Sequence, residues 1–113
     1  MVDINAEAEK SLTKLPYKVC YYYPDEWNAL PVISFFNISD TGAFACDNIS
    51  VIQRGTVVID IWADAPDQCG TINLEIAAQM VGDGWSKEMS MDVPPVDGVY
   101  HKTSRYTKIF NNY

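Results

Sequence analysis

The alternation of apolar and polar positions along the chain predicts two helices and five strands. In the first helix, over residues 4–15, apolar side chains recur at spacings of four, four and three residues, which places them on one helical face. These side chains are Ile4, Ala8, Leu12 and Leu15. Either Asp3 or Asn5 can cap the start of this helix. Pro16 is expected to end it, because the residue before a proline avoids the helical region.

A second helix is predicted from residue 66 to about residue 81. Asp64 and Asp67 are expected to cap its start. Pro66 suits its first turn, and Gly82 is expected to end it. Its apolar stripe consists of Cys69, Ile72, Ile76 and Met80, widened by Leu74, Ala77, Ala78 and Val81. The apolar arc covers roughly two-thirds of the circumference, which is more than a helix lying on a sheet needs. The excess is expected to meet the first helix or another subunit.

Five segments rich in β-branched and aromatic residues, or with alternating polarity, are predicted to be strands. They span residues 17–23, 31–39, 56–63, 86–93 and 100–110. The third strand is apolar on both faces, which predicts a central position in the sheet or contacts on both sides. The fourth alternates and is expected to be half-buried, whereas the mixed polarity of the fifth predicts a sheet edge or a wet face. Residues 40–50 are polar and are expected to form a long loop.

These elements predict one α+β domain over residues 1–113. Strands grouped on either side of a helix favour a mostly antiparallel sheet of four to five strands, with both helices on one face. The order along the chain is helix, three strands, helix, two strands. A chain of 113 residues can bury up to roughly 12,000 Å² on folding, so its core needs no disulfide or metal. No apolar run is long enough to predict a membrane span, and the acidic N-terminus does not resemble a secretory signal.

Composition and charge then narrow the classes of function. Hydrophobic residues make up 48% of the chain and charged residues 20%, which excludes intrinsic disorder. The 15 acidic and 8 basic residues give a net charge of −7, which argues against non-specific binding to nucleic acid. The aromatic residues Tyr21, Tyr22, Tyr23 and Trp27 have only one basic residue nearby, Lys18. Core packing or a protein interface is therefore favoured over the stacking of nucleic-acid bases.

The residues that carry chemistry form no recognisable catalytic constellation. His101, the one histidine, is interpreted as an exposed strand residue rather than a base or ligand, although a Cys–His dyad stays open. Asp60 interrupts an apolar strand and, if buried, is expected to pair with Arg105 or Lys108. Three widely spaced cysteines are interpreted as reduced thiols: Cys20, Cys46 and Cys69. The sequence therefore predicts no enzyme, no catalytic residue, no cofactor and no metal site.

The order of the segments carries a resemblance that covers nearly the whole chain. A short N-terminal helix precedes the strands LPYKVCYYYP and LPVISFF, and the strand VVIDIWAD runs into a second helix. After this helix come the GDGW stop, an alternating strand, and the closing strand YHKTSRYTKIF. In this order and texture the chain resembles the small tail-completion, or tail-terminator, proteins of long-tailed bacteriophages and their prophages. The resemblance implies an α+β fold with a mostly antiparallel sheet and two helices.

The resemblance also implies a non-enzymatic virion protein that acts in head–tail joining. Such a protein assembles as a hexameric ring on the end of the tail tube, stops tube polymerisation and docks to the connector of the filled head. DNA passes through the lumen without specific binding. The implied partners are further copies of the chain, the tail tube protein and the head–tail connector proteins. The oligomeric state of the free chain stays open, between a monomer that a tube end templates into the ring and an oligomer that forms in solution. The implied location is the virion tail or neck, after assembly in the host cytoplasm and without a membrane.

The contacts of such a ring can be assigned to residues as hypotheses. The subunit interface is expected to use the outward half of the second helix and the last strand: Thr71, Glu75, Gln79, Tyr100, Arg105 and Tyr106. Axial contacts with the tube or connector are assigned to the 40–50 segment, including Asp40, Phe44 and Asp47. Acidic side chains expected to line the lumen and repel the DNA phosphates are Asp40, Asp47, Asp64 and Asp67.

Two other functions stay open. A head-completion or neck connector protein on the portal side of the joint would share the ring and differ in its partners. A small enzyme or ligand-binding domain would need a deep pocket that includes His101 or Asp60.

Overall fold

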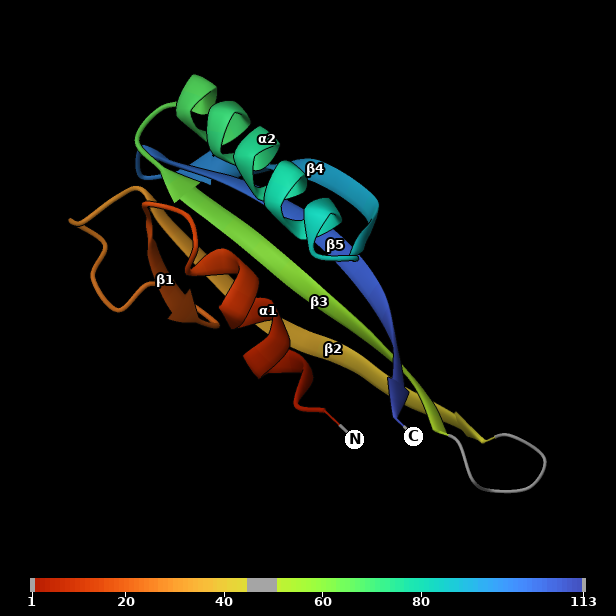
Figure 1. Cartoon of the computed structure of the whole chain (residues 1–113). Coiled ribbons are helices and arrows are strands. Elements are labelled where there is room, and N and C mark those ends of the chain that lie inside the picture. The colour runs from red at the N-terminus through yellow and green to blue at the C-terminus, as the bar shows by residue number, and fades with distance from the viewer. Residues whose placement is uncertain (1, 45–50, 113) are drawn as a thin grey trace.

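The computed structural model describes residues 2–44 and 51–112. It is an α+β fold with two helices and one five-stranded, mostly antiparallel sheet, as the sequence predicted (Figure 1). Several elements begin, end or pair differently from the prediction. Along the chain the elements are α1 (Ile4–Leu12), β1 (Lys18–Tyr21), β2 (Val32–Phe44), β3 (Val51–Ala63), α2 (Pro66–Gly82), β4 (Ser86–Val96) and β5 (Val99–Asn112).

In space the strands follow the order β1-β2-β3-β5-β4. The pairings of β2 with β3, β3 with β5 and β4 with β5 are antiparallel, whereas β1 runs parallel to β2. β3 is therefore central, as its two apolar faces predicted. β5 lies between β3 and β4, so the alternative of a sheet edge for this strand is wrong. Its polar residues lie on both faces of the sheet: His101 and Arg105 on the face away from the core, and Ser104 on the helical side, where its hydroxyl donates to Asn73 of α2.

The hydrophobic core lies between the helices and one face of the sheet. Both predicted helical stripes are buried in it: Ile4, Ala8 and Leu12 from α1, and Cys69, Ile72, Ile76 and Met80 from α2. They face strand side chains that include Ile33, Phe35, Val57, Ile59, Ile61 and Tyr106. Because burial of one large apolar side chain contributes about 1.5–3 kcal/mol, this layer is the main source of stability.

The start of α1 matches one predicted alternative, and its end does not match. Asp3 is the N-cap, and its carboxylate accepts hydrogen bonds from the backbone N–H groups of Asn5 and Ala6. The helix ends at Leu12, three residues before the predicted end. Leu15 lies in the turn after the helix and packs against the core from there. Its spacing of three residues from Leu12 therefore does not show that the helix continues.

The predicted acidic cap of α2 is wrong. The N-cap is Ala65, which is extended and has no side-chain cap hydrogen bond, and Pro66 opens the helix as expected. Asp64 comes one residue too early, because the chain leaves β3 in an extended conformation. Asp67 lies inside the first turn and accepts a hydrogen bond from the adjacent Gln68 N–H. Its charge still favours the helix start through the helix dipole.

The hairpin of β2 and β3 is longer than predicted, since the pairing continues to Phe44 and Val51. The prediction of a loop is therefore wrong for residues 40–44, and residues 45–50 lie outside the described part of the chain. The polarity around Asp40 hid this part of the strand, because backbone pairing rather than side-chain burial holds it in place. In Figure 1 this end of the sheet extends beyond both helices, and the molecule measures 54 × 24 × 22 Å.

Close packing of α1 on the sheet requires glycine at position 55. A Cβ at Gly55 would lie 2.5 to 2.8 Å from side-chain carbons of Ile4. We expect Gly55→Ala to lower the free energy of unfolding by about 1–3 kcal/mol, the usual cost of overpacking a core. Urea unfolding measures this, with Gly42→Ala as the matched control, because a Cβ at Gly42 would have no atom within 4 Å. Equal stability of the two variants would contradict the packing.

Tyr106 is fully buried in the core, and its hydroxyl has no hydrogen-bond partner among the described residues. Burial raises the pKa of Tyr106 to about 12, because the phenolate would lose its hydration there. The folded state therefore holds this proton more tightly than the unfolded state. Its contribution to stability is complete below about pH 10 and is lost as the pH rises through about 12.

We expect Tyr106→Phe to keep or slightly raise stability at neutral pH, since the substitution removes an unpaired buried hydroxyl. The variant should lack the alkaline loss of stability that Tyr106 causes. Urea unfolding of both proteins at several pH values from about 8 to about 12 measures the difference. Parallel losses in the wild type and the variant over this range would show that Tyr106 titrates normally.

Candidate functional site

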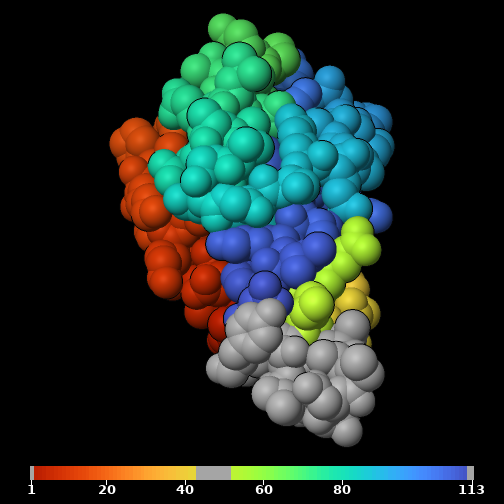
Figure 2. Space-filling view, turned by 45° about the vertical axis from the view of Figure 1, so that its right-hand side comes forward, coloured from red at the N-terminus to blue at the C-terminus, as the bar shows by residue number. Residues whose placement is uncertain are grey.

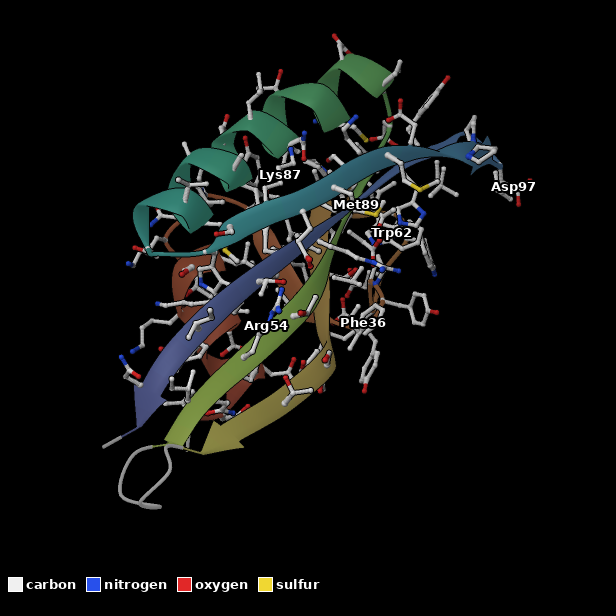
Figure 3. All side chains as sticks on the ribbon, turned by 90° about the vertical axis from the view of Figure 1, so that its right-hand side faces the viewer. Phe36, Arg54, Trp62, Lys87, Met89 and Asp97 are labelled. Carbon is white, nitrogen blue, oxygen red and sulfur yellow. The ribbon has the colours of Figure 1, made fainter. Side chains whose placement is uncertain are left out.

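The face of the sheet that points away from the core carries the surface most suited to binding. Side chains alternate between the two faces along each strand, and the core takes Ile59 and Ile61 of β3 and Tyr106 of β5. The intervening positions form what we call the open sheet face: Phe36, Arg54, Val58, Asp60, Trp62, Met89, Met91, Val93, His101, Thr103 and Arg105. In Figure 3, Trp62 and Phe36 lie on the side of the sheet away from α2.

Trp62 and His101 stack against each other at one end of the open sheet face. They are opposite each other in the pairing of β3 with β5, with ring centroids 3.7 Å apart and planes that differ by 15°. The His101 Nε2 atom lies 2.7 Å from Oδ1 of Asp60. The Trp62 Nε1–H donates a hydrogen bond to Oγ of Ser34 on β2, at 2.9 Å. This cluster therefore joins β2, β3 and β5 on the side that no helix covers.

The carboxylate of Asp60 is buried even though its face of the sheet lacks a helix. Its side chain is 8% exposed and that of His101 is 17% exposed. Aromatic residues of the connection between β1 and β2 gather around Trp62, with Trp27 edge-on at 5.1 Å and Tyr23 at 6.3 Å between ring centroids. Because a buried carboxylate without a partner costs several kcal/mol, the hydrogen bond to His101 is what makes Asp60 tolerable here.

A groove of about 500 Å³ lies beside this cluster. Its lining is mainly apolar and comes from the Trp62 cluster, from Trp27, and from the turn that joins β4 to β5. The lining residues are Trp27, Trp62, Val93, Pro94, Val96, Asp97, Val99 and His101. Asp97 is exposed and is the acidic residue of this lining. Its volume and apolar lining match those of small-molecule sites, and it includes His101, as the alternative of a ligand-binding domain requires. The same lining also suits an apolar side chain of another protein.

Two predictions about this cluster are wrong. Asp60 pairs with His101 and not with Arg105 or Lys108. His101 is not an exposed strand residue, since it is mostly buried between Trp62 and Asp60. The register of β3 on β5 decides both outcomes, because it places Asp60 opposite Thr103 and diagonal to His101. No feature of the sequence alone gives that register.

The cluster has little of what nucleophilic catalysis requires. Among the described residues, no serine or cysteine hydroxyl or thiol hydrogen-bonds to His101. Ser34 is fully buried and already accepts the Trp62 indole hydrogen bond. Cys69 is buried in the core, where desolvation raises the pKa of its thiol, and Cys46 lies outside the described residues. Within the described residues, no group of three or more His, Cys, Asp or Glu side chains could hold a metal ion.

The predicted interface residues are divided between surface and core. Thr71 and Arg105 are exposed, as an interface would need. Tyr106 is fully buried, so this prediction is wrong: β5 turns it toward the core. Tyr100 is half-buried against the core. The predicted contacts of Phe44 and Asp47 lie outside what the structure describes.

Glu75 and Gln79 on α2 have partners within the chain. The Tyr17 hydroxyl donates to Oε2 of Glu75 at 2.8 Å, which raises the pKa of Tyr17. The Gln79 amide donates to Asp83 at 2.9 Å. Hydrogen bonds from Ser11 and Gln79, together with Lys14, lower the pKa of Asp83 to about 2. Glu75 therefore links α2 to Tyr17, and Gln79 hydrogen-bonds to the C-cap of its own helix, so both side chains already have partners within the chain.

The described acidic residues that were predicted to line a lumen lie far apart along the sheet, and Asp47 lies outside the described residues. Asp40 pairs with Gly55 near the extended end of the sheet, whereas Asp64 and Asp67 follow the other end of β3. The rise of about 3.3 Å per strand residue puts Asp40 and Asp64 roughly 30 Å apart. At this separation Asp40 and Asp64 would lie at different heights along a channel. They would not form one ring of carboxylates at the same height.

Comparisons with known proteins add no assignment: no family model matches the chain, and no curated protein matches it. Among the described residues, no helix is long and apolar enough to cross a membrane.

We expect His101→Phe to keep the stack on Trp62 and to lose the hydrogen bond to Asp60. The buried carboxylate then has no partner, and the free energy of unfolding should fall by about 1–3 kcal/mol. Replacing both partners, as in Asp60→Val with His101→Phe, should recover much of this loss, because no buried charge remains. Urea unfolding of the three proteins measures both effects. A single variant as stable as the wild type would show that the pair contributes nothing.

Proposed function

We propose that this chain is a non-enzymatic structural protein of a bacteriophage, which caps the tail tube as a ring and joins the tail to the head connector. The virion assignment rests on the resemblance of the ordered segments to tail-completion proteins. The observation that carries the assembly role is the side of the sheet without a helix, where Tyr23, Trp27 and Met91 are exposed around the partly buried Trp62. An exposed apolar surface of this kind is typical of protein association.

The types of side chain exposed at the surface support association, whereas the total accessible surface area is that of an ordinary monomer. The accessible surface is 6355 Å², close to the roughly 6,200 Å² expected of a monomer of this mass. The exposed large apolar side chains include Tyr21, Tyr22, Tyr23, Trp27, Leu74, Val81, Met91, Val96 and Ile109. Tyrosine and tryptophan are enriched at the centres of protein interfaces, which fits a chain that works in an assembly.

The elongated shape supports contacts along the axis of a ring. The paired ends of β2, β3 and β5 project beyond the helices (Figure 1). A projecting hairpin can reach a tail tube or a connector while the helical layer stays in the body of the ring. The negative charge fits a channel that DNA crosses without binding, since carboxylates repel phosphates.

The length of the tail tube tests this function. In the phage or prophage that encodes this chain, we expect removal of its coding sequence to give tubes longer than the regular length and filled heads without tails. Electron microscopy of negatively stained lysates measures both, and expression of the chain from a second copy of the gene should restore normal particles.

The head-side alternative gives a different result in the same experiment. Without a head-completion or neck protein, tails keep their regular length and only the joining to heads fails. Tubes of regular length in the absence of the chain would therefore overturn the proposed role as a tail terminator.

A further inference from the structure

The outward side of α2 is apolar where a surface helix is normally charged. Leu74 is 72% exposed and Val81 is 57% exposed, and Thr71 and Ala78 are exposed beside them. We call Thr71, Leu74, Ala78 and Val81, with Gly70 and Gly82 at the ends, the outer face of α2. In Figure 2, the green and teal atoms of α2 form the surface, with no other described segment over them. An apolar arc wider than the sheet can cover leaves apolar side chains at the surface of the helix, where another protein can bury them.

The spacing along the outer face of α2 favours a packed partner. Thr71, Leu74, Ala78 and Val81 follow one another at intervals of three, four and three, so their side chains form one straight ridge. α2 has two charged residues, one before the ridge and one beside its middle. Asp67 is in the first turn, and Glu75 is bound to Tyr17.

One glycine lies inside α2 without a packing reason in this chain. A Cβ at Gly70 would have no atom within 4 Å, and Gly70 lacks the positive φ that favours glycine. Glycine inside a helix weakens it, and close approach of another surface to the backbone of α2 would explain its presence at this position. Gly82 is the last residue of α2, where a glycine suits the end of a helix.

The same molecule carries a surface that complements this ridge. The open sheet face lies on the opposite side of the sheet from α2 and includes the apolar groove of about 500 Å³ beside Trp62. Its cations Arg54 and Arg105 have no carboxylate partner among the described residues. At the start of α2, Asp64 and Asp67 have no cation partner among the described residues. Each face has apolar side chains that nothing in the same chain covers. Each also has charged side chains without a partner of opposite sign, and the other face carries charges of that sign.

We propose that the outer face of α2 in one subunit docks on the open sheet face of the next copy of this chain. The Leu74 ridge lies along the Trp62 groove, and Asp64 and Asp67 approach the arginines of the neighbour. Since the two surfaces are on opposite sides of the subunit, the contact is head-to-tail, and its repetition forms a closed ring or an open filament. The inference rests on the proposed ring-forming function. It assigns Asp64 and Asp67 to the subunit contact and leaves Asp40 as the described candidate for the lumen.

A matched pair of lysine variants tests the ridge. Ala78 and Ala6 are both exposed alanines on helices, but only Ala78 belongs to the outer face of α2. Sedimentation of the full chain over a concentration series up to about 1 mM measures self-association. We expect Ala6→Lys to associate like the wild type and Ala78→Lys to associate at least about tenfold more weakly, which is about 1.4 kcal/mol. Urea midpoints of both variants close to that of the wild type show that folding is intact.

Glycine 70 gives a second test that does not depend on introducing a charge. We expect Gly70→Ala to raise the urea midpoint of the monomer, because alanine favours the helix, and to weaken self-association, because the added Cβ lies where the neighbour approaches. A variant that gains stability and associates as well as the wild type would contradict close docking at this position.

A charge exchange tests which surface the ridge meets. Asp67→Arg and Arg105→Asp should each weaken self-association, and the double variant should recover it, because the opposite charges face each other again. Recovery supports docking on the open sheet face. A chain in which Arg105→Asp has no effect while Ala78→Lys abolishes association would show helix-to-helix docking and overturn the proposal. A wild-type chain that stays monomeric throughout the series would also overturn it.

These outcomes are separable from the test of the tail function. Self-association through the two faces with tubes of regular length in the deletion would retain the interface and reject the tail-terminator role. Overlong tubes with a chain that is monomeric in solution would retain that role and reject this interface.

Discussion

The pairing of β3 with β2 on one side and with β5 on the other is the constraint on which the rest of the structure depends. β3 is paired along nearly its whole length on both sides, so each of its side chains has a fixed face and fixed neighbours. Ile59 and Ile61 thereby face the helices, and Asp60 and Trp62 face the other way. Because the period of a strand is two, a slip of one residue would bring Asp60 into the apolar core and expose the isoleucines.

This constraint also explains why a carboxylate can be buried on the side of the sheet without a helix. The register brings His101 diagonal to Asp60 and opposite Trp62. The imidazole of His101 therefore stacks on the Trp62 ring and also forms the hydrogen bond to the Asp60 carboxylate. The aromatic residues Tyr23 and Trp27 then exclude water from this end of the sheet. A polar pair enclosed by aromatic rings fixes the geometry of the groove beside it, since moving either ring would expose or unpair Asp60.

A two-layer domain has two outward faces, and in this molecule both are partly apolar. The helices cover one side of the sheet, and the outer face of α2 presents Leu74 and Val81 where charged residues are usual. The opposite side of the sheet presents Trp62, Phe36 and Met91. Carboxylates lie at the start of α2, and the sheet face carries Arg54 and Arg105 as well as the acidic residues Glu88 and Asp97 near its margins. Attraction between the carboxylates of α2 and these arginines favours contacts between unlike faces.

The sequence by itself determined the helical stripes, the central position of β3 and the class of fold, because periodic burial of apolar side chains is a local pattern that each segment carries alone. It also revealed the excess apolar arc of α2, although not where that arc points. Only the tertiary structure decided that β1 runs parallel to β2, that residues 40–44 extend the hairpin, and that Asp60 meets His101. Those outcomes depend on the register between strands far apart in the chain. Register is set by the packing of the whole core, so no local pattern of polar and apolar residues contains it.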